Sequence, residues 1–160
     1  MKNITLTRID DRLIHGQVVA FWMKEHPINK ILIIDDTLSK DMFMSRIYKA
    51  AAPAGTEVIL QNREDGLAFL QQEPERNESI FLIVKGPESL EELIDAGINI
   101  PEIILGGMGA RNERVTFNRN VSASKDEIAC FSRILAKGTR IVYQMIPSDK
   151  PIPIQSFIKQ

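Results

Sequence analysis

Hydrophobic and polar positions follow two different patterns along the chain. Residues 30–35 and 79–84 are almost continuously aliphatic, as expected for strands that are buried on both faces of a sheet. Over residues 16–24, apolar side chains recur at helical spacing, which predicts an amphipathic helix. Further strands are expected at residues 3–9, 56–61, 101–105 and 139–145. Four more helices are expected, each opened by a residue that commonly starts a helix: Ser39 (helix to residue 51), Asn62 (64–71), Pro87 (to 97), and Ser124 with Glu127 as a capping box (to 138).

This alternation of strands and helices predicts an α/β fold with an open, mostly parallel sheet. Helices are expected on both of its faces, which gives three layers, α/β/α. No repeat or linker divides the 160 residues, so residues 1–160 are expected to form a single domain. Ligands of open α/β sheets bind at the carboxyl ends of the strands. The loops at 10–15, 35–37 and 106–111 are therefore expected to share one edge of the sheet.

Composition and charge exclude several classes of function. A net charge of -1 argues against a general nucleic-acid binder, so no nucleic-acid partner is expected. No apolar run is long enough to span a bilayer, and residues 2–6 show no signal-peptide pattern, so a cytoplasmic location is expected. Two distant histidines and a single cysteine offer no metal-ligand spacing. Neither a metal nor a cofactor is expected.

Candidate chemistry is concentrated in residues 7–18, which contain one of the two histidines, His15. Imidazole is a nucleophile near neutral pH, and arginine is suited to hold an anion beside it. The neighbours of this histidine combine both charges with a glycine: Arg8, Asp10, Asp11, Arg12 and Gly16. The segment therefore predicts a site for an anion next to a nucleophile.

The expected helix start at Gly16 strengthens this interpretation. The backbone N–H groups of Gly16, Gln17 and Val18 would favour an anion, and Gly16 has no side chain to obstruct a phosphate. An aspartate of this segment could orient an arginine, or hold the imidazole tautomer by accepting its N–H. Together these features predict a phosphohistidine site. A general acid–base histidine and a purely structural one remain the alternatives.

Other polar and glycine clusters have simpler structural interpretations. His26 follows the end of a helix and is expected to be an exposed loop residue. The glycines at 106–109 follow a strand but complete no dinucleotide-binding motif, so a tight turn that lines the crevice is favoured. Asp35 and Asp36 could act as a carboxylate pair, although aspartate is common where strands end. Cys130 is expected to be buried and inert.

Residues 8–18 closely resemble the N-terminal signature of the IIB components of bacterial sugar phosphotransferase systems, in the mannose/fructose/sorbose class. The resemblance covers essentially the whole chain, because later segments follow the family pattern in order: 33–36, 52–55, 106–108 and 120–122. It implies an open, mostly parallel α/β fold, in agreement with the elements predicted above. The glycine loop at 106–108 leans towards the mannose, fructose or sorbose branch, but the sequence does not specify the sugar.

The resemblance also implies an enzyme activity, that of a protein-Nπ-phosphohistidine–sugar phosphotransferase. Such a IIB protein accepts a phosphoryl group from a phosphohistidine on the IIA protein and carries it on the Nδ1 atom of its own histidine. It then passes the group to a sugar that the membrane components IIC and IID present. Carried onto this sequence, the acceptor is His15, and Arg12 assists the transfer. Arg8, Asp10 and Asp11 match the rest of the motif without defined roles.

Three further residues complete the expected phosphate- or partner-binding set: Gly16, Gln17 and Asp36. The role of Asp36 is the least defined, because residues 35–38 depart from the commoner Asp-Glu-Val form of this loop. No IIA sequence is fused to the chain, so the donor is expected to be a separate protein. The resemblance implies a cytoplasmic protein that associates transiently with the inner face of the cell membrane.

Two other classes of function stay open. A histidine phosphatase or mutase has an arginine directly before its His-Gly pair, where this chain has Ile14, and needs a second catalytic histidine. A regulatory or nucleotide-binding α/β domain would be stabilised by nucleotides, and a phosphorylated partner would not label it.

Overall fold

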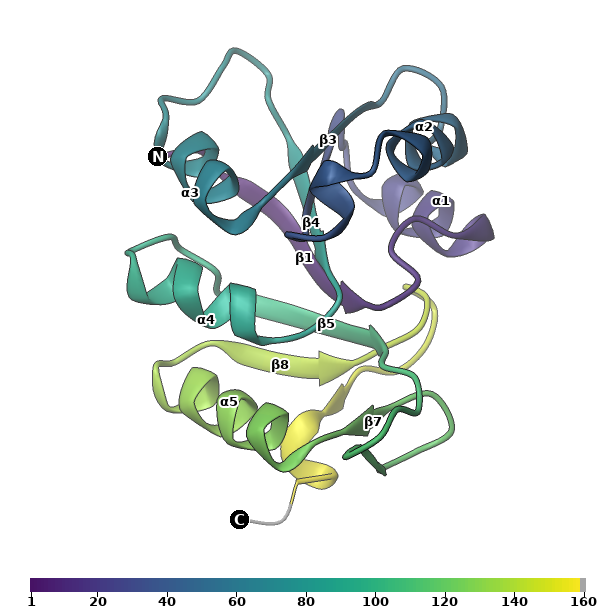
Figure 1. Cartoon of the computed structure of the whole chain (residues 1–160), viewed down its shortest axis with the longest axis vertical. Helices are drawn as coiled ribbons and strands as arrows, with labels where there is room; N and C mark the ends of the chain where they lie inside the picture. The colour runs from purple at the N-terminus through teal and green to yellow at the C-terminus, as the bar shows by residue number, and fades with distance from the viewer. Residues whose placement is uncertain (159–160) are drawn as a thin grey trace.

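A seven-stranded sheet forms the centre of the protein (Figure 1). The computed structural model describes residues 1–158, with every side chain among them except that of Gln17. The strands are β1 (Ile4–Asp10), β2 (Lys30–Ile34), β3 (Glu57–Gln61), β4 (Ile80–Val84), β5 (Glu102–Gly107), β8 (Arg140–Tyr143) and β9 (Ile152–Pro153). They lie in the order β3-β2-β4-β1-β5-β8-β9, and only the last pair is antiparallel. The mostly parallel sheet is thus confirmed.

Helices cover both faces of this sheet, which confirms the three-layer α/β/α class. Helices α1 (Gly16–Glu25) and α2 (Met42–Ala51) pack on one face, over a core that includes Trp22 and Phe81. The opposite face carries α3 (Arg63–Gln71), α4 (Glu88–Asp95) and α5 (Lys125–Ala136). All five residues of β4 are buried, as the continuous aliphatic run predicts. In the part of the chain described, no helix combines the length and the apolar character needed to cross a membrane.

The start of the second helix differs from the prediction. Ser39 lies within a separate 3-10 helix, η1 (Leu38–Lys40), and does not cap α2. This extra turn forms because the carboxylate of Asp35 accepts the N–H of Leu38 at 2.9 Å. The cap of α2 is Asp41, whose side chain accepts the N–H of Met44 at 3.0 Å. By contrast, the predicted caps at Asn62 and at Ser124 with Glu127 are confirmed: α3 and α5 begin there.

Three short strands and one 3-10 helix in the second half of the chain were not predicted as such. Strands β6 (Val115–Thr116) and β7 (Ser122–Ala123) form a small antiparallel pair in the connection between β5 and α5. Strand β9 and the 3-10 helix η2 (Ile154–Ser156) close the chain beside β8. Strand β8 itself ends at Tyr143, two residues earlier than predicted.

The opposite edge of the sheet holds a buried cluster of charges. The carboxylate of Glu78, whose side chain is 1% exposed, accepts hydrogen bonds from the ammonium groups of Lys2 and Lys30, at 2.9 Å and 2.6 Å. Burial alone would raise the pKa of Glu78, but these hydrogen bonds outweigh burial and lower it. The cluster ties the N-terminus to the segment before β4.

Candidate functional site

The loops after β1 and β5 meet where these two neighbouring strands end, and they enclose an open depression of about 310 Å³. Its lining includes most of the residues that the sequence singled out, together with some that it did not: Asp10, Asp11, Arg12, His15, Gly106 to Ala110, Arg119, Asn120 and Met145. Helix α1 starts directly after His15, at the rim of this depression. Of the three loops expected at the carboxyl edge of the sheet, those at 10–15 and 106–111 line this one depression.

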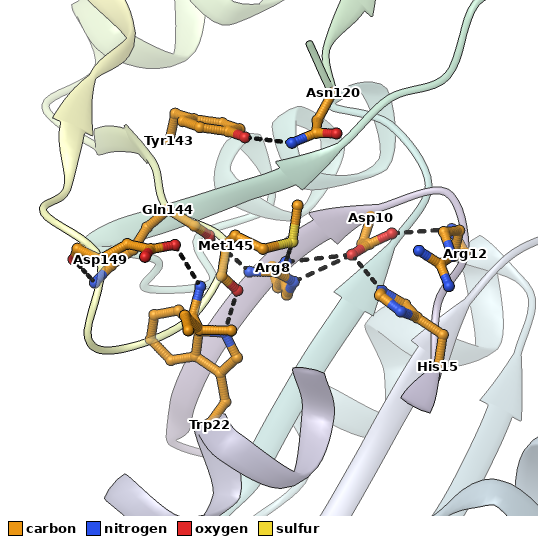
Figure 2. Close-up of polar contacts among 11 residues, drawn as sticks. Arg8, Asp10, Arg12, His15, Trp22, Asn120, Tyr143, Gln144, Met145 and Asp149 are labelled. Atoms are coloured by element: carbon orange, nitrogen blue, oxygen red, sulfur yellow. Dashed lines mark hydrogen bonds and ion pairs between the residues drawn. The ribbon is translucent and has the colours of Figure 1, made fainter. Parts of the chain in front are cut away.

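His15 is the N-cap residue of α1, with an extended backbone. Its Nε2 atom lies 2.8 Å from Oδ2 of Asp10, so one ring nitrogen is occupied by the neighbouring carboxylate (Figure 2). The imidazole is 12% exposed. The turn before it includes Leu13 in a left-handed conformation, with φ of 57°, while its side chain is anchored in the core. Such strain in a bulky residue occurs where the fold fixes a functional loop.

Asp10 connects the groups of the site. Besides His15, its Oδ2 atom accepts two hydrogen bonds of 3.3 Å from the guanidinium of Arg8, and its Oδ1 atom accepts the backbone N–H of Arg12 at 3.0 Å. Burial opposes the ionisation of Asp10, but the hydrogen bond to His15 and the charge of Arg8 outweigh it and hold its pKa below the ordinary value. The carboxylate is therefore ionised at neutral pH and can only accept hydrogen bonds.

Arg8 is 1% exposed and does not reach the surface of the depression. In addition to Asp10, its guanidinium donates to the carbonyl oxygen of Gln144 at 2.9 Å and lies 5.8 Å from the ring of Trp22 (Figure 2). Burial lowers its pKa, while the Asp10 carboxylate acts in the opposite direction. This placement favours a role in positioning Asp10 over direct contact with a phosphate.

The glycines after Leu105 belong to the site for a reason other than a tight turn. Gly106 and Gly107 are the last two residues of β5, so the predicted turn is wrong at these positions. A Cβ atom on Gly106 would clash with the guanidinium of Arg8, with Nε at 2.7 Å and two further atoms nearer still. A glycine at 106 is therefore what allows Arg8 to lie flat beside β5.

Arg12 and Asp11 lie on the open side of the site. The side chain of Arg12 is exposed and lines the depression, where it can contact an anion on His15. The carboxylate of Asp11 accepts the backbone N–H of Gly109 at 2.6 Å, which joins the loop after β1 to the loop after β5. Gly16 has a φ of 45°, a left-handed conformation that favours glycine. The side chain of Gln17 lies outside the part of the structure that is described.

Asp36 is not brought to His15. Its Oδ1 atom accepts the backbone N–H of Arg63 at 2.8 Å, at the start of α3. It lines a second cavity, of about 580 Å³, that opens among the first residues of α3, α4 and α5 and thus on the other side of the sheet. The two cavities have no lining residue in common.

Sequence reasoning missed three residues that hold the site from behind. The indole of Trp22 donates to the carbonyl oxygen of Met145 at 2.9 Å (Figure 2). The carbonyl oxygen of the preceding residue, Gln144, accepts the hydrogen bond from the guanidinium of Arg8. The available signal was only that the last predicted strand ends at the same edge of the sheet. Among the described residues, no group of three histidine, cysteine or acidic side chains is arranged to hold a metal ion.

The fold and the site define a class: an α/β protein that presents one histidine, beside a buried acid–arginine pair, at the carboxyl edge of a parallel sheet. Residues 4–160 match the family model of the sorbose subfamily of IIB components of the phosphotransferase system, and the chain belongs to this family.

Relatives of known name or structure agree with this assignment. The chain is 30% identical to the sorbose-specific EIIB component of Lacticaseibacillus casei, over 91% of this chain and 89% of that one. It is 27% identical to the mannose-specific EIIAB component of Escherichia coli, over 98% of this chain and 49% of that longer protein. The crystal structure of the IIBSor domain of the sorbose permease from Klebsiella pneumoniae superposes with a TM-score of 0.92, at 29% identity, covering 98% of this chain and 95% of that one.

The family establishes the type of reaction. IIB components accept a phosphoryl group from the IIA component and pass it to a sugar, so the chain is a phosphotransferase of a sugar-transporting phosphotransferase system. This assignment replaces the two alternatives that the sequence left open, a histidine phosphatase and a nucleotide-binding domain.

Proposed function

We propose that His15 is the phosphoryl carrier of this IIB component, and that residues 1–160 act as a single IIB domain. In this proposal, Nδ1 of His15 attacks the phosphorus of the phosphohistidine on IIA. The bond between phosphorus and the IIA nitrogen breaks as the bond to Nδ1 forms, and the IIA nitrogen keeps the electron pair. The IIC and IID membrane components then present the sugar that receives the group.

The hydrogen bond between His15 and Asp10 is the observation that carries this proposal. The ionised Asp10 can only accept, so Nε2 bears the proton and the lone pair is left on Nδ1. A partner that fixes one ring nitrogen in this way selects the tautomer and the ring orientation. When the phosphorylated ring gains positive charge, the same carboxylate stabilises it.

Arg8 supports Asp10 from inside the protein. Its guanidinium is buried and is already engaged by the Asp10 carboxylate and the Gln144 carbonyl, so it is proposed to orient the acid and not to bind phosphate. Arg12 and the first turn of α1, which no side chain caps, are proposed to hold the phosphoryl oxygens. Gly16 and Gln17 would contribute backbone N–H groups there.

We further propose a IIA protein or domain as the phosphoryl donor. The E. coli relative named as an EIIAB component, of which this chain matches 49%, supports a IIA partnership. Transfer through IIC and IID would bring the protein, acting in the cytoplasm, transiently to the inner face of the cell membrane. Asp11, which fastens the two loops of the depression, is proposed to shape the surface that these partners meet.

The two histidines of the chain provide a matched test. His15→Ala and His26→Ala would each be incubated with a phosphorylated IIA protein and assayed for an acid-labile label. His26 stacks against Trp22 at the end of α1, outside the depression. The label should be lost in His15→Ala and retained in His26→Ala. A label that persists in His15→Ala would refute the proposal, as would a phosphorus–nitrogen coupling assigned to Nε2 by NMR.

A further inference from the structure

A second exposed arginine borders the depression that contains His15. Arg119 lies in the turn between β6 and β7, far from the N-terminal motif in the sequence, yet it lines the same cavity as His15 and Arg12. The guanidinium of Arg119 makes no hydrogen bond or ion pair with a residue in the described part of the chain. It is thus available to a ligand in this cavity.

The turn that carries Arg119 is held in place on both sides. The Oδ1 atom of Asn118 accepts the N–H groups of Asn120 and Val121, each at 2.9 Å. The side chain of Asn120 donates to the hydroxyl of Tyr143 at 2.7 Å, and its carbonyl accepts the N–H of Met108 at 2.9 Å (Figure 2). The backbone next to Arg119 is therefore fastened to the ends of β5 and β8, which fixes the origin of its side chain.

The charges of the depression call for a second cation once His15 is phosphorylated. A phosphoryl group on nitrogen brings about two negative charges, into a cavity that already holds the carboxylates of Asp10 and Asp11. The guanidinium of Arg8 is turned inward to the Asp10 carboxylate and the Gln144 carbonyl. Of the arginines that line the cavity, Arg12 comes from the β1 side and Arg119 from the far side of β5.

We propose that Arg119 is a phosphoryl-binding residue, which completes with Arg12 a pair of guanidinium groups around the phosphoryl carried by His15. This inference rests on the proposed function. As the phosphorus–nitrogen bond to IIA breaks and the bond to Nδ1 forms, Arg119 donates N–H groups to the oxygens of the transferring group. A guanidinium suits this task because its planar fork matches two phosphoryl oxygens, and it gives up no proton.

The test compares Arg119→Gln and Arg119→Lys with Arg111→Gln. Arg111 belongs to the same connection and is also exposed, but it lines the other cavity. Transfer from phosphorylated IIA is followed under single-turnover conditions at increasing IIA concentrations, which separates the maximal rate from the half-saturating concentration. Arg119→Gln should lower the maximal rate about tenfold or more, the scale of one charge-assisted hydrogen bond, at unchanged half-saturation. Arg119→Lys should recover part of the rate, and Arg111→Gln should equal the wild type.

A second readout does not depend on the rate of transfer. In the wild type, phosphorylation of His15 should shift the NMR resonance of the Arg119 Nε–H group, whereas that of Arg111 should stay in place. Equal maximal rates for Arg119→Gln and Arg111→Gln would overturn the inference, and so would an effect confined to the half-saturating IIA concentration. If the wild type took up no label at His15, the proposed function would fail first and this inference with it.

Discussion

Replacing Gly106 by alanine should disrupt the site from its buried side. The added methyl group would lie 2.7 Å from Nε of Arg8 and closer still to two other guanidinium atoms, which is well inside any normal contact. Neither partner can move away easily. Arg8 is held by Asp10 and the Gln144 carbonyl, and β1 and β5 are joined by parallel pairing at Arg8 with Ile104.

The loss of stability depends on whether the backbone or the side chain of Arg8 moves to relieve the clash. If the backbone yields, overpacking of this kind costs about 1–3 kcal/mol. If Arg8 is expelled, Asp10 is left as a buried carboxylate without its countercharge, and breaking a buried pair in this way costs about 3–5 kcal/mol. Because Arg8 has several acceptors and almost no exposed surface, we expect the total to be about 3–5 kcal/mol. For a chain of this length, that corresponds to a fall in the melting temperature of roughly 10 °C.

Gly107→Ala is the matched control for this substitution. Gly107 is the next residue of the same strand, but a Cβ atom there would meet its nearest neighbour, Oδ1 of Asp10, at an ordinary 3.5 Å. Urea unfolding of both variants and the wild type gives the free energy of unfolding, with the slope as a check that the unfolded state is unchanged. In an Arg8→Ala background, Gly106→Ala should cost much less, because the clash is gone. Equal unfolding midpoints for Gly106→Ala and Gly107→Ala would refute the reasoning.

Three other predictions test separate parts of the structure. Asp10→Asn should slow phosphoryl acceptance by on the order of 10²–10⁴, because an amide can donate to His15 and reverse its tautomer. Single-turnover labelling measures this rate, and a rate equal to that of the wild type would contradict the prediction. Glu78→Gln should cost about 3 kcal/mol by urea unfolding at pH 7, since it breaks the buried pair with Lys30. Because the pKa of Glu78 is lowered in the folded protein, its contribution to stability is present above the ordinary pKa of 4.5 and is lost as the pH falls through the pKa of the folded state. The Glu78→Gln variant should therefore lose less stability on acidification than the wild type. Parallel profiles of stability against pH would count against this. Asp41→Ala should lower the free energy of unfolding by about 1 kcal/mol, whereas Ser39→Ala should leave it nearly unchanged. A larger loss for Ser39→Ala than for Asp41→Ala would mean that Ser39 caps α2 after all.

The sequence predicted the fold well because its signals are local. Continuous aliphatic runs located β2 and β4 to within one or two residues, and the capping box at Ser124 placed the start of α5. Ser39 misled because a serine at a helix start looks the same whether it caps that helix or lies in a preceding turn. The hydrogen bond between Asp35 and Leu38 makes residues 38–40 a turn of their own, and α2 then starts from its cap, Asp41.

The site was predicted in part, for a related reason. His15, Asp10 and Arg12 are close in sequence, so their proximity needed only the turn between β1 and α1. Asp36 was grouped with them because all three loops end parallel strands, but the sequence does not reveal that β4 separates β1 from β2. Arg119 reaches the depression because Val121 pairs with Met108, directly after β5, an interaction that no local pattern in the sequence encodes.

The buried pair of Arg8 and Asp10 shows what the proposed carrier site requires of the fold. A buried ion pair commonly stabilises a protein no better than a well-packed apolar pair would, because both charges must lose their water. Here the pair is kept at the end of a central strand, where two residues spaced by two point to the same face. That spacing lets an interior arginine hold a carboxylate, and lets the carboxylate hold a histidine at the rim of an open depression. The buried charges therefore cost stability, but they fix one nitrogen of the ring that we propose to meet two successive partners.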